Sequence, residues 1–209
     1  NAYNNLADEV TSKFRGGFWF KTIERFFVLN AYMKHYNIDK LFHGEIDNLI
    51  FSLENISNYL DERGSGLFYP MLNYKIAAAS LIYINSTIEL DRMCAYFNAQ
   101  KAFKDDMSML AEYSRNSQNV FNLPSENNLS GDHFMCIENQ NCIFDVASIG
   151  QYMFGTDLRN SGKPVFNKFQ NTHCISDLSL MKFRIDEFQN GFFLKKNDHE
   201  FKIINIHVH

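Results

Sequence analysis

The stretch Leu-Phe-His-Gly-Glu-Ile-Asp-Asn-Leu-Ile-Phe, residues 41–51, sets β-preferring residues around two carboxylates. It follows a polar turn at residues 37–40, so we expect a strand that ends in an acidic loop. Glu45 and Asp47 are two residues apart, and along an extended segment their side chains point the same way. Ligands of open α/β sheets bind outside the carboxyl ends of strands, so this pair predicts a site for a hard divalent cation. An ordinary solvated turn is the alternative interpretation.

Helical and extended patterns alternate on either side of this stretch. Apolar residues at helical spacing, glycine stops and acidic first turns predict helices over residues 18–36, 54–62, 88–99 and 105–115. The run 77–84 is apolar without alternation, which indicates a strand covered on both faces. Alternating helices and strands indicate an α/β domain.

The C-terminal half has a different character. Residues 116–141 are rich in Asn, Ser and Gly, which predicts a long surface excursion, and a short helix is expected over 145–154. Alternating apolar residues flank Asn190-Gly191, which predicts an antiparallel hairpin, and 201–209 is expected to form a final strand. These patterns predict a mixed central sheet flanked by helices, with a C-terminal antiparallel hairpin.

The composition excludes several classes of protein. The 209 residues are 45% hydrophobic and 21% charged, as in a globular domain, and a net charge of −4 gives no electrostatic reason to bind nucleic acid. No apolar stretch reaches the roughly 18 residues of a transmembrane segment, and the start is not signal-like, so we expect a cytoplasmic protein. Four cysteines without CxxC spacing indicate neither a disulfide scaffold nor a zinc knuckle. There is no GxGxxG, P-loop or GxSxG motif.

The chain ends on a second group of residues that could carry chemistry. His207 and His209 alternate to one face of the expected strand, so their imidazoles could coordinate a transition metal together with carboxylates from residues 45–47. With His43, the same residues would also suit an unrelated two-histidine, one-carboxylate metalloenzyme. Exposed, inert histidines near a chain end are the plainer alternative.

A third candidate lies in the segment Phe-Asp-Val-Ala-Ser-Ile-Gly-Gln-Tyr, residues 144–152, and the residues that follow it. Asp145, Gln151 and Asp157 are the polar residues of interest. Taken one at a time, they also suit an N-cap, a surface position and a turn.

Four stretches of the chain form an ordered set: Trp-Phe-Lys-Thr-Ile-Glu-Arg-Phe-Phe at 19–27, Phe-His-Gly-Glu-Ile-Asp-Asn-Leu-Ile-Phe at 42–51, Ile-Phe-Asp-Val-Ala-Ser-Ile-Gly-Gln-Tyr-Met-Phe-Gly-Thr-Asp-Leu-Arg-Asn at 143–160, and Ile-Asn-Ile-His-Val-His at 204–209. Together they resemble a family of glycosyltransferase-like proteins with the GT-A fold of nucleotide-diphospho-sugar transferases. The resemblance runs over nearly the whole chain and implies a single GT-A-like domain over residues 1–209. The usual N-terminal leader strand is then missing, or present in reduced form in residues 1–17.

The resemblance implies transfer of a sugar from a nucleoside-diphosphate sugar donor to a glycan or other hydroxyl acceptor, with Mn²⁺ or Mg²⁺ on the diphosphate. Glu45-Ile-Asp47 occupies the family's acidic DxD-type motif, and Asn48 follows it in the donor-binding segment. His207 and His209 match the closing His-x-His pattern and would be further metal ligands.

For Asp145, Gln151 and Asp157 the resemblance implies catalytic positions near the donor sugar or the acceptor. Glu stands where the family has its first Asp, so a non-catalytic metal- or sugar-binding protein on the same scaffold is an alternative function.

Overall fold

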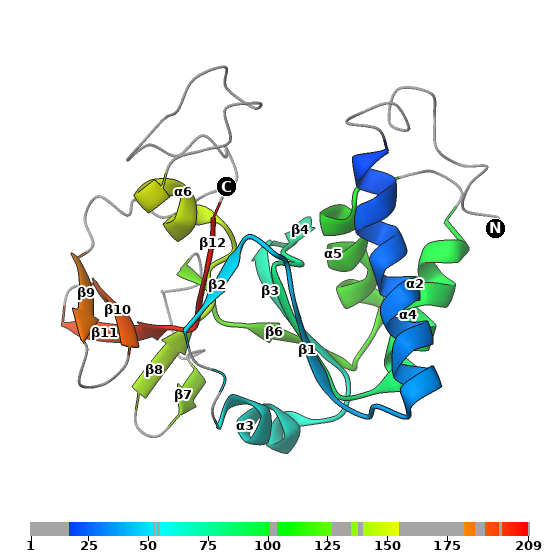
Figure 1. Ribbon diagram of the computed structural model, residues 1–209, viewed down its shortest axis with the longest axis horizontal. Helices are drawn as coiled ribbons and strands as arrows, with labels where there is room; N and C mark the ends of the chain where they lie inside the picture. Colours follow the sequence, from blue (N-terminus) through cyan, green and yellow to red (C-terminus); the bar gives the residue numbers. More distant parts are fainter. Residues whose placement is uncertain are drawn as a thin grey trace.

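The computed structural model describes residues 17–51, 53, 55–100, 104–126, 135–137, 140–154, 182–186, 191–196 and 198–208. Within these ranges the chain forms five helices, two five-stranded sheets and one two-stranded sheet (Figure 1). The helices are α2 (Phe18–Tyr36), α3 (Ile56–Arg63), α4 (Thr87–Asn98), α5 (Asp106–Asn116) and α6 (Ser148–Phe154). The strands are β1 (Leu41–Gly44), β2 (Asn48–Ile50), β3 (Leu67–Asn73), β4 (Ile76–Ala77), β5 (Leu81–Ile84), β6 (Val120–Leu123), β7 (Met135–Ile137), β8 (Gln140–Ile143), β9 (Lys182–Asp186), β10 (Gly191–Lys196), β11 (His199–Ile203) and β12 (Asn205–His207).

The first sheet has the order β1-β5-β3-β4, and β6 also pairs with β3. Only the β3–β6 pairing of this sheet is parallel, so the predicted mixed sheet is confirmed. Strand β5 is buried along its whole length. Leu81 and Tyr83 pack into one apolar cluster while Ile82 and Ile84 pack into another, so the strand is covered on both faces as predicted. The strand was predicted to begin at residue 77 but begins at Leu81, and residues 76–77 form the separate strand β4.

Helices α2, α4 and α5 cover one face of this sheet (Figure 1). The side chain of Ser86 caps α4 by accepting the N–H of Glu89, and that of Asp105 caps α5 by accepting the N–H of Ser108. None of the helices in the described ranges is both long and apolar enough to cross a membrane.

The second sheet has the order β7-β8-β11-β10-β9. Strands β9 and β10 are antiparallel, which confirms the predicted hairpin. The prediction of a surface excursion over residues 116–141 is wrong for residues 120–123, which form β6 of the first sheet, and for residues 135–137 and 140–141, which form β7 and the start of β8 in the second. Strand β3 was not predicted. It contains Pro70, which is tolerated because only Leu67 and Phe68 of β3 pair with β5 and Pro70 lies beyond them.

The end of the chain forms two strands instead of the single one expected. Strand β11 belongs to the second sheet, whereas β12 pairs antiparallel with β2, with His207 opposite Asn48. Between them the backbone of Ile204 donates to Ile143 at 2.9 Å and accepts the N–H of Phe51 at 2.9 Å. The chain therefore changes sheets at Ile204, and this change carries His207 toward the end of β1.

Helix α6 lies so close to β12 that one position must be glycine. A Cβ atom on Gly150 would lie 1.8 Å from the carbonyl oxygen of His207, well inside any real contact distance. Gly44 is a milder case, because its Cβ would meet the end of the Ile50 side chain at 3.2 Å. The absence of a side chain at Gly150 therefore sets the distance between α6 and the strand that carries His207.

We predict that Gly150→Ala lowers the free energy of unfolding by at least about 2 kcal/mol, since the backbone of β12 must move to admit the methyl group. Gly44→Ala is the matched control, and its cost should stay below about 1 kcal/mol because a flexible side chain can give way. Urea unfolding of both variants measures this, and equal losses would contradict the proposed close packing.

Candidate metal centre

The two carboxylates of the acidic motif are held by a turn. Strand β1 ends at Gly44 and β2 begins at Asn48, so Glu45 and Asp47 lie in the connection, not on the extended segment that was expected. The turn is closed by two backbone hydrogen bonds, from Asn48 to the carbonyl of Glu45 at 3.1 Å and from Glu45 to the carbonyl of Ser80 at 3.0 Å. Both carboxylates are thereby fixed at the end of the first sheet.

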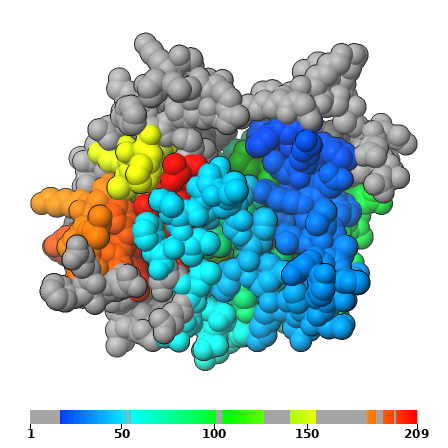
Figure 2. All heavy atoms as spheres, viewed as in Figure 1, coloured from blue at the N-terminus to red at the C-terminus, as the bar shows by residue number. Residues whose placement is uncertain are grey.

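His207 meets both carboxylates, although it comes from the opposite end of the chain. Its Nε2 lies 3.1 Å from Glu45 Oε2 and 3.3 Å from Asp47 Oδ1. The backbone N–H of Val208 also donates to the Asp47 carbonyl at 2.8 Å. One ligand atom from each of Glu45, Asp47 and His207 lies within 4.8 Å of the others, as a shared metal ion would require. Figure 2 shows the β1–β2 segment in cyan beside the red end of the chain.

The pKa values of these groups record strong mutual attraction. Burial alone would lower the pKa of His207, but the hydrogen bonds that its imidazole donates to Asp47 and Glu45 raise it to about 10. Burial opposes ionisation of Glu45, yet His207 and the Arg25 guanidinium bring its pKa down to about 2. The hydrogen bond to His207 likewise lowers the pKa of Asp47. Without a cation, protonated His207 therefore neutralises the carboxylates.

Hydrogen bonds between the side-chain amides of Asn48 and Asn205 join β2 to β12 next to the cluster. The side chain of Asn48 donates to the Ser80 carbonyl at 2.6 Å and accepts a hydrogen bond from the Asn205 side chain at 2.9 Å. The Asn205 side chain also donates to the carbonyl of Asp145 at 3.2 Å. Asn48 thus supports the backbone of the site, and its predicted contact with a donor stays a prediction.

Asp145 is fully buried and engages backbone N–H groups with both of its carboxylate oxygens. Oδ1 accepts from Ala147 and Ile149 at 3.0 Å, and Oδ2 accepts from Gly150 at 2.9 Å and from His207 at 3.0 Å. The structure therefore gives Asp145 a positioning role for His207. A direct contact with sugar or acceptor stays a prediction.

A second buried carboxyl group, that of Glu126, lies beside the same segment. It accepts long hydrogen bonds of 3.4 Å from the N–H groups of Val146 and Ser148. Burial and the nearby Asp145 raise the pKa of Glu126 well above its ordinary value, and burial also raises that of Asp145. Because four N–H groups stabilise the charge of Asp145, we expect Glu126 to be the member of this pair that is protonated.

Of the remaining candidate residues, Gln151 and His43 are described by the structure, and neither belongs to the cluster. Gln151 lies on α6, and its buried Oε1 has no hydrogen-bond partner in the described part of the chain. Asp157 and His209 lie outside the described residues. His43 is on β1, and burial together with Arg25 lowers its pKa to about 4, but it is not among the three clustered residues.

Two residues that sequence reasoning did not assign to the site adjoin it. Arg25 of α2 forms ion pairs with Glu45 Oε1 and with Asp106 Oδ2 at the start of α5. Arg25 lies in the stretch 19–27 that carries part of the resemblance, and Asp106 lies in the helix predicted over residues 105–115. No local pattern joins them, because the contact depends on the packing of two helices.

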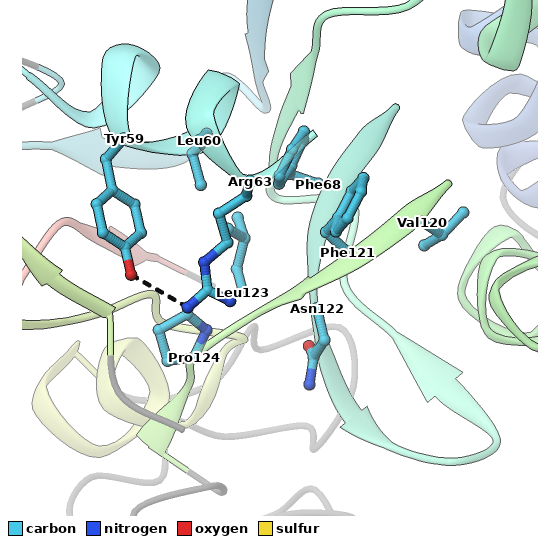
Figure 3. A pocket seen from close by; sticks show the side chains of 9 residues that line it. All are labelled: Tyr59, Leu60, Arg63, Phe68, Val120, Phe121, Asn122, Leu123 and Pro124. Carbon is cyan, nitrogen blue, oxygen red and sulfur yellow. Dashed lines mark hydrogen bonds between the residues drawn. The ribbon is translucent and has the colours of Figure 1, made fainter. Parts of the chain in front are cut away.

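A cavity of about 210 Å³ lies elsewhere, between α3 and β6 (Figure 3). Arg63 and Tyr59 flank it, with the guanidinium donating to the Tyr59 hydroxyl at 3.1 Å, and Phe68 and Phe121 stack along its wall. None of its lining residues belongs to the acidic cluster, so it is a separate feature.

Comparison with protein-family models, curated proteins and solved structures finds no significant match for this chain. These comparisons therefore indicate neither a ligand nor an activity for the chain. The donor set itself is informative, because two carboxylates and one imidazole suit a divalent cation such as Mn²⁺.

The pKa shifts predict how the stability of the metal-free protein depends on pH. The raised pKa of His207 stabilises the fold fully below its ordinary value of 6.5, and this contribution is lost as the pH rises toward about 10. The lowered pKa of Glu45 stabilises the fold above about pH 4.5, and this is lost as the pH falls toward about 2. Both contributions are complete only between about pH 4.5 and 6.5.

We therefore expect the difference in free energy of unfolding between the wild type and His207→Gln to be largest near pH 5.5 and to shrink by pH 9.5. Urea titrations in a chelator at both values measure it. The exposed His35 on α2 provides a control, His35→Gln, that should change stability little at either pH. A His207 difference that stays constant with pH would argue against the charged cluster.

Proposed function

We propose that this chain is a metal-dependent glycosyltransferase, which moves a sugar from a nucleoside-diphosphate sugar donor to a hydroxyl acceptor. The observation that carries the proposal is the meeting of Glu45, Asp47 and His207 in one cluster. They are three of the four residues for which the sequence resemblance implies metal binding, and the fourth, His209, lies outside the described residues. Their convergence from a turn and from the end of the chain supports that interpretation.

The donor chemistry fits the cation that the resemblance implies. Glu45 and Asp47 supply the oxygen ligands that hard divalent ions prefer, and His207 supplies one nitrogen once its proton has left. When bound, Mn²⁺ or Mg²⁺ would stabilise the charge that grows on the leaving diphosphate. The protein's own contribution is to hold the three ligands in place, through the turn at residues 45–47 and through Asp145 behind His207.

Both carboxylates of the cluster suit the cation of a glycosyltransferase, whereas a two-histidine, one-carboxylate metalloenzyme would use only one of them. In the described residues the cluster contains one histidine and two carboxylates. Such an oxygen-rich set suits Mn²⁺ and Mg²⁺ better than the ions of imidazole-rich sites. The non-catalytic metal- or sugar-binding protein remains the second candidate, since it would use the same cluster.

We expect Asp47→Ala to weaken Mn²⁺ binding by about 100-fold or more, because residues that merely orient a ligand already contribute about 10- to 100-fold. The side chain of Asp47 is 52% exposed, so the variant should remain folded by circular dichroism. Isothermal titration with Mn²⁺ gives the Kd. The control is Asp39→Ala, which removes an exposed carboxylate before β1. Unchanged Mn²⁺ affinity in Asp47→Ala would refute its role as a ligand.

If the chain has a donor site, UDP or GDP should raise its thermal stability above that seen with Mn²⁺ alone, and only when Mn²⁺ is present. A ligand that binds only the native protein at 100 times its Kd stabilises it by about 2.7 kcal/mol. Thermal unfolding with each nucleotide, with and without Mn²⁺, tests this. A shift with Mn²⁺ alone that neither nucleotide increases would favour the non-catalytic binding protein, and no shift at all would oppose both candidates.

A further inference from the structure

The two carboxylate oxygens of Glu45 have different partners, because Arg25 binds one of them. Its guanidinium engages Oε1, while Oε2 lies 3.1 Å from His207 Nε2, on the side of the cluster. A carboxylate can rotate about its last bond and offer either oxygen, or both, to a cation. With Oε1 occupied by Arg25, only Oε2 is directed at His207 and Asp47.

The guanidinium is itself anchored from a second helix. Its other terminal nitrogen forms an ion pair with Asp106 Oδ2, and Asp106 is buried at the start of α5. The guanidinium also lies 5.1 Å from the ring centroid of Phe26, a fully buried side chain of α2. Arg25 is thus held by groups that belong to the helical layer and not to the metal cluster.

We propose that Arg25 is the positioning residue for Glu45, and that the pair Arg25–Asp106 fixes the ligand geometry of the cluster. The inference rests on the proposed function in that Glu45 must be a metal ligand. Arginine suits the role because its planar fork can serve two carboxylates at once, whereas lysine is a point charge.

The charge of Arg25 and its positioning of Glu45 should change the affinity for Mn²⁺ in opposite directions, so the two effects can be told apart. A positive charge beside the cluster repels a cation, so a residue that contributed only charge would weaken Mn²⁺ binding. A residue that positions Glu45 strengthens it. Arg25→Lys keeps the charge and removes the fork, so it isolates the geometric contribution.

We expect Arg25→Lys to raise the Kd for Mn²⁺ by about tenfold or more, in the range found for groups that orient metal ligands. Because Arg25 acts through Glu45, the same change made in a Glu45→Gln background should alter the Kd less than about twofold. The matched control is Arg92→Lys on α4, which alters an arginine–carboxylate pair with Glu89 away from the cluster. It should leave the Kd unchanged.

Isothermal titration with Mn²⁺ and urea unfolding in a chelator separate the outcomes. Arg25→Lys with lower stability but wild-type Kd would overturn the proposal, since the ion pairs would then be structural only. Equal effects in the wild-type and Glu45→Gln backgrounds would also overturn it. If the wild type binds no Mn²⁺, the proposed function and this inference fail together.

A second variant, Asp106→Asn, removes the anchor and keeps Arg25. It should raise the Kd by about threefold or more if the anchor matters for ligand geometry. It also covers the case in which Arg25→Lys does not fold. An unchanged Kd in folded Asp106→Asn would limit the positioning role to Arg25 alone and overturn the proposed pair.

Discussion

The buried carboxylate of Asp145 is the constraint on which the candidate site depends. Desolvating a carboxylate is costly unless its charge is stabilised by hydrogen bonds, and here four backbone N–H groups supply that stabilisation. Three of them open α6 and the fourth belongs to His207. One side chain therefore joins the start of a helix to the strand that carries the imidazole, and Gly150 lets the two backbones approach closely enough for it.

The cluster has a stable arrangement without a metal ion. Protonated His207 lies between two carboxylates, and Arg25 neutralises the outer oxygen of Glu45. A cation must therefore displace the proton from His207, so proton and metal compete for the same three side chains. The ion pairs with His207 and Arg25 explain how these carboxylates can lie close together without an ion.

Local chemistry made the helices and the hairpin predictable. Ser86 and Asp105 cap their helices as their side chains suggest, and the hairpin predicted around residues 190–191 forms from β9 and β10, with Gly191 as the first residue of β10. What could not be predicted depends on pairing between distant segments. Strand β6 is short and mostly apolar, but the Asn- and Ser-rich residues around it led to the prediction of a loop, and β3 contains Pro70, a residue that is uncommon inside a strand. For the site, spacing and resemblance selected Glu45, Asp47 and His207, but the change of sheet at Ile204 that unites them has no local signal. The contact of Arg25 with Asp106 depends on helix packing and has none either.

The position of the cluster gives a bound cation a structural consequence. Glu45 and Asp47 lie at the end of the first sheet. His207 lies on β12, which is joined through Ile204 to β11 of the second sheet. In the described residues, β2 and β12 form a separate two-stranded pairing between these sheets. A ligand that binds only the folded arrangement adds its binding free energy to that pairing. Because the segment between Asp47 and His207 spans most of the chain, an ion that joined them would close a long loop, which removes more conformational entropy from the unfolded chain than closing a short one.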